Sequence, residues 1–147
     1  MELANINDFS QLSPIPDAVI RRLAVGDEVK LSTKYEHFWL RIVESCDQHF
    51  FGILQTALQQ SPGGAIGIII EFNKHNIFDV FGIELYYNLL TSIDDVAFDW
   101  AIKRLSNQSA LSEDKIAGII YRVTNAYENS RKLEPFVDKR LDRIRTI

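Results

Sequence analysis

The chain has 147 residues, of which 46% are hydrophobic and 24% charged. This length suits one domain of about 150 residues, and this composition excludes a disordered chain, which is poor in apolar residues. The formal net charge is −4, from 16 basic and 20 acidic residues, which argues against general nucleic-acid binding because such binding depends on neutralising phosphates.

The cellular compartment of the protein is predicted from three features that the sequence lacks: a pair of cysteines, a signal peptide and a membrane-spanning stretch. The single cysteine, Cys46, cannot form an intramolecular disulfide, which fits a reducing compartment. The first eleven residues have neither the basic start nor the apolar run of a signal peptide. The longest apolar stretch, near residues 65–72, is far shorter than the ~20 residues that span a bilayer. We therefore expect a cytoplasmic protein with no membrane span.

The first 82 residues predict an antiparallel β structure after a loop-like start. A short helix over Asp17–Ala24 is followed by the helix-ending pair Gly26-Asp27. Polar or glycine-rich breaks separate four predicted strands, and Ser45–Gln48 between the second and third indicates a β-hairpin. The strands are predicted at Glu28–Ser32, His37–Glu44, His49–Thr56 and Gly67–Phe72. Short strands with turns at this spacing favour a small antiparallel barrel.

The alternation of side chains along these strands predicts which of them enter the core. The second strand has one purely apolar face, and Trp39, Arg41 and Val43 form its other face. The predicted core comprises Phe38, Leu40, Ile42, Leu54, Ile68 and Ile70.

The second half predicts helices, so the chain divides into residues 1–82 and 83–147. Apolar residues recur at helical spacing over Gly82–Leu90, Ile93–Ser106, Glu113–Arg131 and Pro135–Arg145. Thr91 or Ser92 is expected to cap the second of these helices, and Ser112 the third. The fold class is therefore α+β: a small antiparallel barrel followed by a C-terminal helical region packed on or beside it.

Five sequence motifs over residues 23–80 narrow the type of barrel. The motifs are Gly26-Asp27-x-Val29-Lys30-Leu31, Glu36-x-Phe38-Trp39-Leu40-x-Ile42, Phe51-Gly52-x-Leu54, Gly67-x-x-Ile70-x-Phe72 and Ile77-x-Asp79-Val80. In their order and spacing they resemble a family of small bacterial domains of unknown function, found on chromosomes and mobile elements. The resemblance implies an SH3-like barrel and no particular chemistry. The sequence departs from the family pattern at Ile68 and Asn76, where the family usually has an acidic residue and a histidine.

Catalytic and metal-binding patterns are weak. Zinc ligands usually come in closely spaced pairs, whereas Cys46 and His49 have no second pair, and the predicted hairpin register places His49 opposite Glu44, far from His37. No nucleophile elbow, phosphate-binding loop or metalloprotease motif is present. We expect no catalytic residues, no metal and no cofactor, and a thiol-dependent enzyme using Cys46 is the least favoured function.

Two features point to binding of another protein. Trp39, which shares a strand face with Arg41, is either exposed for binding or covered by the C-terminal helices. Residues 130–147 carry a net charge of +3, and Lys139, Arg140 and Arg143 lie away from the apolar stripe of their helix. These five residues are the expected binding residues. The favoured function is a non-enzymatic protein-binding module, the alternative is a phage or plasmid accessory protein that inhibits or adapts a host machine, and a homo-oligomer is left open.

Overall fold

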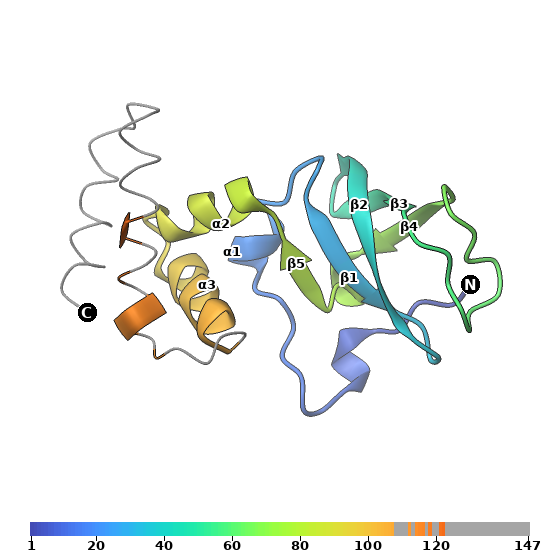
Figure 1. Ribbon diagram of the computed structural model, residues 1–147, viewed down its shortest axis with the longest axis horizontal. Helices are drawn as coiled ribbons and strands as arrows, with labels where there is room; N and C mark the ends of the chain where they lie inside the picture. Colours follow the sequence, from blue (N-terminus) through green and yellow to red (C-terminus); the bar gives the residue numbers. More distant parts are fainter. Residues whose placement is uncertain (108–111, 113, 117, 119–120, 123–147) are drawn as a thin grey trace. The chain divides into compact units, whose positions relative to one another are not determined.

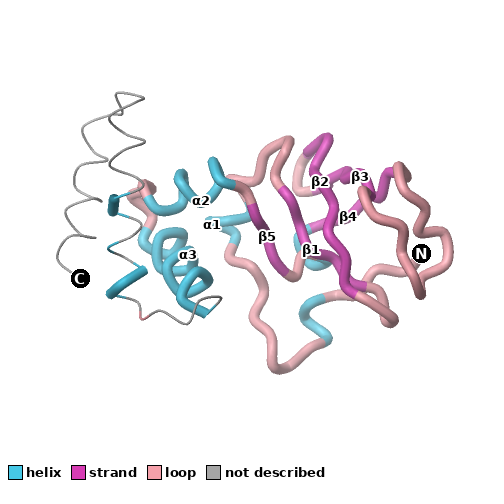
Figure 2. Tube along the Cα trace, in the orientation of Figure 1, coloured by secondary structure: helices cyan, strands magenta, loops and turns pink. Residues whose placement is uncertain are grey.

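The computed structural model describes residues 1–107, 112, 114–116, 118 and 121–122 (Figure 1). The chain divides after Leu85 into two compact units, which are described separately here. This division falls inside a helix, three residues after the expected boundary. The strands belong to the first unit, and α2 and α3 follow them along the chain (Figure 2).

The first unit is built on one antiparallel sheet of five strands. Its strands are β1 (Glu28–Ser32), β2 (His37–Cys46), β3 (His49–Leu54), β4 (Ile69–Asn73) and β5 (Asp79–Phe81). Their order across the sheet is β4-β3-β2-β1-β5, so β5 returns to pair with β1 (Figure 1). With helices following it, the sheet confirms the α+β class. The sheet is not closed, because β4 and β5 are its two edges.

The core lies on one face of this sheet. Along β2, Phe38, Leu40 and Ile42 are buried while the residues between them are exposed, as the alternation predicts. Leu54 and Ile70 are buried as well. Ile68 was expected in the core but is only half-buried. It lies just before the first residue of β4, where its carbonyl accepts a hydrogen bond from the Leu54 N–H over 3.0 Å.

Ile70 and its neighbour Ile69 provide a direct test of the two faces. Ile70 is 9% exposed and Ile69 is 62% exposed. We expect Ile70→Ala to lower the free energy of unfolding by about 2–5 kcal/mol, because it removes buried methyl groups and leaves a cavity. Ile69→Ala is the matched control and should change it by less than about 0.5 kcal/mol. Equal effects in urea denaturation would mean that the faces of β4 are wrongly assigned.

The β2–β3 hairpin differs from the predicted register. Its loop is the two residues Asp47 and Gln48, with φ of 46° and 69°, the backbone of a type I′ turn. His49 therefore lies opposite Cys46, and not opposite Glu44 as predicted from the sequence. The pairing also shifts between Ile42 and Glu44, where Val43 forms a bulge. The prediction was wrong because it centred the turn between Cys46 and Asp47, whereas the turn is centred between Asp47 and Gln48.

The turn strain predicts a stabilising substitution. An L-residue in the left-handed region is disfavoured by roughly 1–2 kcal/mol, whereas glycine adopts it readily. We expect Gln48→Gly to raise the free energy of unfolding by about 0.5–1 kcal/mol, since the gain is partly offset by a more flexible unfolded chain. Gln48→Ala keeps the strain and should give no gain. A destabilised glycine variant in thermal denaturation would contradict the I′ turn.

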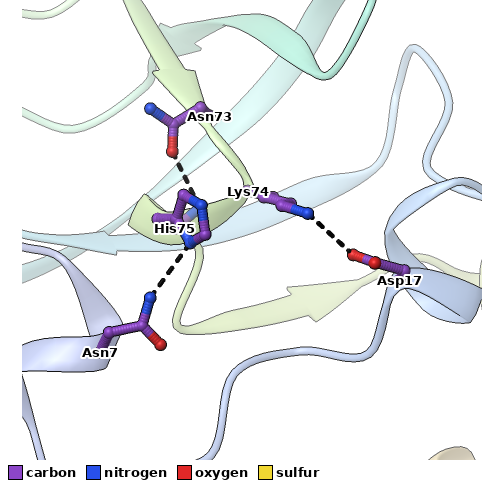
Figure 3. Close-up of polar contacts among 5 residues, drawn as sticks. All are labelled: Asn7, Asp17, Asn73, Lys74 and His75. Atoms are coloured by element: carbon purple, nitrogen blue, oxygen red, sulfur yellow. Dashed lines mark hydrogen bonds and ion pairs between the residues drawn. The ribbon is translucent and has the colours of Figure 1, made fainter.

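The N-terminal segment is more ordered than predicted. It forms a 3₁₀ turn, η1 (Ile6–Asp8), and its Ala4 N–H donates to the Ser32 carbonyl over 2.8 Å. A second 3₁₀ turn, η2 (Lys74–Asn76), links β4 to β5 and is capped by Asn73. Asn7 Nδ2 lies 3.1 Å from His75 Nδ1, joining the two turns (Figure 3).

Helix α1 is shorter than predicted. It spans Asp17–Ile20 and not Asp17–Ala24. After it the chain forms turns, whose hydrogen bonds join residues three apart, such as the bond from Leu23 N–H to the Ile20 carbonyl. Lys74 Nζ lies 3.4 Å from Asp17 Oδ1 and connects η2 to the start of α1 (Figure 3). This contact is between partly exposed groups, so it adds little stability.

The helices after the sheet are α2 (Ile83–Leu90) and α3 (Asp95–Asn107). The expected cap of α3 was Thr91 or Ser92, but Asp94 Oδ1 accepts from Val96 N–H over 3.0 Å. Ser92 Oγ instead accepts from the Asp94 N–H. Further along, Ser112 Oγ accepts from Lys115 N–H over 3.3 Å, which confirms Ser112 as a cap. The helix predicted over Pro135–Arg145 lies outside the described residues.

Candidate functional site

The outer face of the sheet carries the two predicted binding residues of β2. Trp39 is 39% exposed, and the strand alternation places Arg41 on the same face. In the register, Trp39 lies opposite Lys30 of β1, and Arg41 lies between Glu28 of β1 and Ile53 of β3. The structure therefore brings Trp39 and Arg41 together on one surface.

Apolar side chains surround Arg41 on this face. Val43, in the bulge, is 40% exposed and Ile69 of the edge strand 62%. Ile53 of β3 lies opposite Arg41 of β2 on one side and opposite Ile69 of β4 on the other, so the three side chains share this face of the sheet. We call Trp39, Arg41, Val43, Ile53 and Ile69 the outer-face patch. Contiguous exposed apolar side chains of this kind mark surfaces that bind other proteins.

The single cation of the outer-face patch has a weak internal partner. Arg41 Nη2 lies 3.6 Å from Glu28 Oε1, and the two side chains are 50% and 33% exposed. An exposed ion pair of this length contributes about 0–1 kcal/mol. The Arg41 guanidinium can therefore exchange Glu28 for an acidic group of a ligand at little expense.

A cavity of about 360 Å³ adjoins the patch at the corner where β1, β2 and the β5–α2 connection meet. We call it the corner cavity, and its lining residues are Val25, Gly26, Asp27, Glu28, Arg41, Phe81, Gly82, Ile83 and Glu84. One row of paired residues runs from it across all five strands: Phe81, Glu28, Arg41, Ile53 and Ile69. The corner cavity and the outer-face patch thus form one continuous surface.

Asp27 is the buried acid of the corner cavity. It is 9% exposed, and its Oδ2 accepts from Ala24 N–H over 2.8 Å. Its Oδ1 lies so close to Gly82 that a Cβ at that position would be 2.4 Å away. Burial raises the pKa of Asp27 above 3.8, and Glu84 raises it further, against the lowering effect of the Ala24 hydrogen bond. Folding is therefore disfavoured as the pH rises through that pKa, because the buried carboxylate must then ionise.

A second cavity, of about 670 Å³, lies at the β1–β2 loop. It is lined by the N-terminal residues 1–5, by Asp8 and Phe9, and by Thr33, Lys34, Tyr35, Ser61 and Pro62. The Lys34 ammonium stands 5.0 Å from the Tyr35 ring centroid. None of the expected binding residues lines it.

The loop beside this second cavity is held by Glu36. Its carboxylate accepts from the N–H groups of Gln59 and Gln60, over 3.0 and 2.6 Å, and from the Ser61 hydroxyl over 3.0 Å. Desolvation acts to raise the pKa of Glu36, but these hydrogen bonds outweigh it and hold the pKa below 4.5. The carboxylate is therefore the anchor of the β3–β4 loop.

Acid should weaken this anchor. The lowered pKa means that Glu36 stabilises the fold above its unfolded-state pKa and loses this effect as the pH falls through its folded-state pKa. We expect Glu36→Gln to melt at a lower temperature than the wild type at pH 7, with the difference shrinking below about pH 4. Glu44→Gln, at an exposed position of β2, serves as the control. A difference that is constant between pH 7 and pH 3 would contradict this role.

The corrected hairpin register brings the only thiol next to a histidine. Cys46 is exposed and lies opposite His49, whose Nδ1 is 3.5 Å from Glu71 Oε1. Within the described part of the chain, no group of three His, Cys, Asp or Glu side chains is arranged to hold a metal ion.

The other expected binding residues, Lys139, Arg140 and Arg143, lie outside the described residues. Sequence reasoning missed Asp27, Glu84 and Gly82, which meet only because β5 returns to β1. A signal was present in Gly26-Asp27 and in Gly82-Ile83-Glu84, where a glycine precedes an acid by one or two residues. Among the helices that the structure describes, none is long and apolar enough to cross a membrane.

Comparison of the chain with protein-family models, with curated proteins and with solved structures gave no match.

Proposed function

We propose that this chain is a non-enzymatic protein-binding module, and that it binds its partner through the outer-face patch. The observation that carries the proposal is the exposure of Trp39, Val43 and Ile69 on one sheet face around Arg41. Tryptophan and arginine are the residues most enriched where a few side chains supply most of the binding energy. We also propose that the protein is cytoplasmic, because a single cysteine fits a reducing compartment.

The strand order supports an SH3-like barrel as the framework of the module. β1 to β4 follow one another across the sheet, and β5 returns to β1 after the 3₁₀ turn η2. The bulge at Val43 bends β2, as barrels require of strands that turn a corner. The proposed resemblance to the bacterial domain family of unknown function rests on the same residues, 23–80.

A polar rim accompanies the apolar patch. Lys30 lies opposite Trp39, and Glu28 opposite Arg41. Charged groups at the margin of a binding surface orient a partner and set the rate of association, while the central aromatic group supplies affinity. The geometry thus fits a partner with an apolar segment flanked by charges.

Site-specific photocrosslinking in the native host tests this function. A benzophenone amino acid is placed at Trp39, at Ile69 and, as the matched control, at Tyr35, which is 49% exposed in the β1–β2 loop. We expect the first two positions to give the same discrete adduct with another protein and the control to give none, because only the first two lie on the outer-face patch.

Three outcomes would overturn the proposal. The first is no adduct from either sheet position, and the second is an equal adduct from Tyr35. The third is an adduct with the mass of two copies of this chain, which would assign the outer-face patch to a homo-oligomer.

A further inference from the structure

The sheet of the first unit has β4 (Ile69–Asn73) as an edge strand, because within the described part of the chain it pairs with β3 alone. An edge strand presents backbone N–H and C=O groups that can pair with a strand of another chain. The opposite edge, β5, has three residues, and its Val80 N–H donates to Asp79 Oδ1 over 2.9 Å. β4 is therefore the longer edge, and it carries Ile69 of the outer-face patch.

The hydrogen bonds at the two ends of β4 show which way its backbone groups point. Just before the strand, the Ile68 carbonyl accepts from the last N–H of β3 over 3.0 Å, so it points into the sheet. At the last residue, Asn73 N–H donates to Asn76 Oδ1 over 3.0 Å and so points away from β3. These directions alternate along an antiparallel strand. The N–H and C=O groups of Ile69 and Glu71 therefore point outward.

The outward groups of Ile69 and Glu71 form a short, bounded edge. No backbone group outside the sheet ladder bonds to them among the residues described. At the start of the edge, Gly67 has a φ of 88° and its N–H donates to the Leu54 carbonyl over 2.8 Å, the geometry of a bulge that begins with a left-handed glycine. At its end, the Asn73 N–H is already used by its cap. An added strand is therefore held in register on two residues.

The side chains of Ile69 and Glu71 determine what an added strand must carry. Both are exposed and both lie on the outer face, two residues apart in β4. Side chains directly opposite one another on antiparallel strands are in contact, and apolar pairs or opposite charges are favourable there. The His49 Nδ1 atom lies 3.5 Å from Glu71 Oε1, a contact between exposed groups that adds little stability. The edge therefore fits a strand with an apolar residue opposite Ile69 and a basic residue opposite Glu71.

A second copy of β4 fits this edge less well. Antiparallel self-pairing about Ile70 places the exposed Ile69 opposite a glutamate, and self-pairing about Glu71 places two carboxylates opposite each other, which is destabilising. Residues 1–85 contain six basic and eleven acidic residues, a net charge of −5. Two copies of this unit therefore repel each other at long range, whereas a basic strand is attracted.

We propose that the partner protein adds one extended strand to the edge of β4, antiparallel to it, with an apolar side chain opposite Ile69 and a basic side chain opposite Glu71. This inference rests on the proposed function for the existence of the partner. Backbone hydrogen bonds to the edge supply affinity, and the two side-chain positions supply specificity. The other outward side chains of the added strand then lie next to the outer-face patch.

A peptide that presents one strand tests the edge without the partner. The probe is a cyclic β-hairpin whose open strand reads Thr-Lys-Thr-Val-Thr, which places lysine opposite Glu71 and valine opposite Ile69. Cyclisation keeps the strand extended and reduces the entropy lost on binding. In the ¹⁵N-labelled full chain at pH 7, we expect millimolar probe to shift the Ile69 and Glu71 amides saturably and to slow their hydrogen exchange. The exchange of Ile70, whose N–H points to β3, should not change.

Two altered hairpins separate backbone pairing from charge. Methylation of the valine nitrogen removes the donor to the Ile69 carbonyl and should weaken binding about tenfold or more. Glutamate in place of lysine should weaken it about two- to fivefold, and Glu71→Lys should reverse this preference. Glu44→Lys makes the same change of charge at an exposed position of β2, and it should keep the preference of the wild type.

The inference fails on any of three results with the folded wild type. The first is the absence of shifts at Ile69 and Glu71 with the lysine hairpin. The second is equal binding of the methylated hairpin, which would mean that side chains alone make the contact. The third is a shift of these two amides with protein concentration in the absence of a probe, which would assign the edge of β4 to a second copy of the chain.

Glu71→Pro separates this inference from the proposed function. Proline at an outward-pointing position removes a donor of the free edge and keeps the pairing with β3, and the amide spectrum of the variant reports its fold. It should abolish the adduct crosslinked from Trp39, whereas Glu71→Gln, which keeps the donor, should retain the adduct. An unchanged adduct in a folded proline variant would keep the protein-binding function and reject strand addition. Hairpin binding without any crosslinked partner would reject that function and keep the strand-binding edge.

Discussion

The pairing of β2 along both of its edges is the constraint on which the first unit depends. β1 and β3 hold it by backbone hydrogen bonds, so each of its side chains must lie on one face of the sheet or the other. Phe38, Leu40 and Ile42 are buried on the core face. The same alternation then forces Trp39 and Arg41 outward. Folding and the proposed binding surface are thus linked, because a slip of one residue would bury the arginine and expose the core.

That alternation is also why much of this unit could be predicted from sequence. The bounds of β1 match the predicted strand, and the buried residues of β2 match its predicted apolar face. The hairpin register was predicted wrongly because the turn residues are Asp47 and Gln48. Period-two counting also does not detect the bulge at Val43, which shifts the register again. Alternation also failed to predict where β4 begins: Ile68 was placed in the strand because it is hydrophobic, but the strand starts at Ile69.

The corner cavity lay beyond sequence reasoning for a different reason. Its acids come from the start of β1 and from the residues after β5, which are far apart along the chain. They meet because β5 pairs with β1, and sequence patterns gave no warning of that pairing. The close approach of Asp27 to Gly82 explains why glycine suits that position. Trp39 and Arg41, by contrast, were predictable, because one strand's own alternation placed them.

Cys46, His49 and Glu71 are the strongest argument for a thiol enzyme, and their surroundings weigh against it. Nucleophilic catalysis needs donors for a developing oxyanion and a site that excludes water. Cys46 is exposed, and the His49 and Glu71 side chains are 61% and 60% exposed. Neither of the two cavities described above is lined by them. The corner cavity instead combines a buried acid, apolar walls and continuity with an exposed aromatic surface, and these features support the proposed binding function.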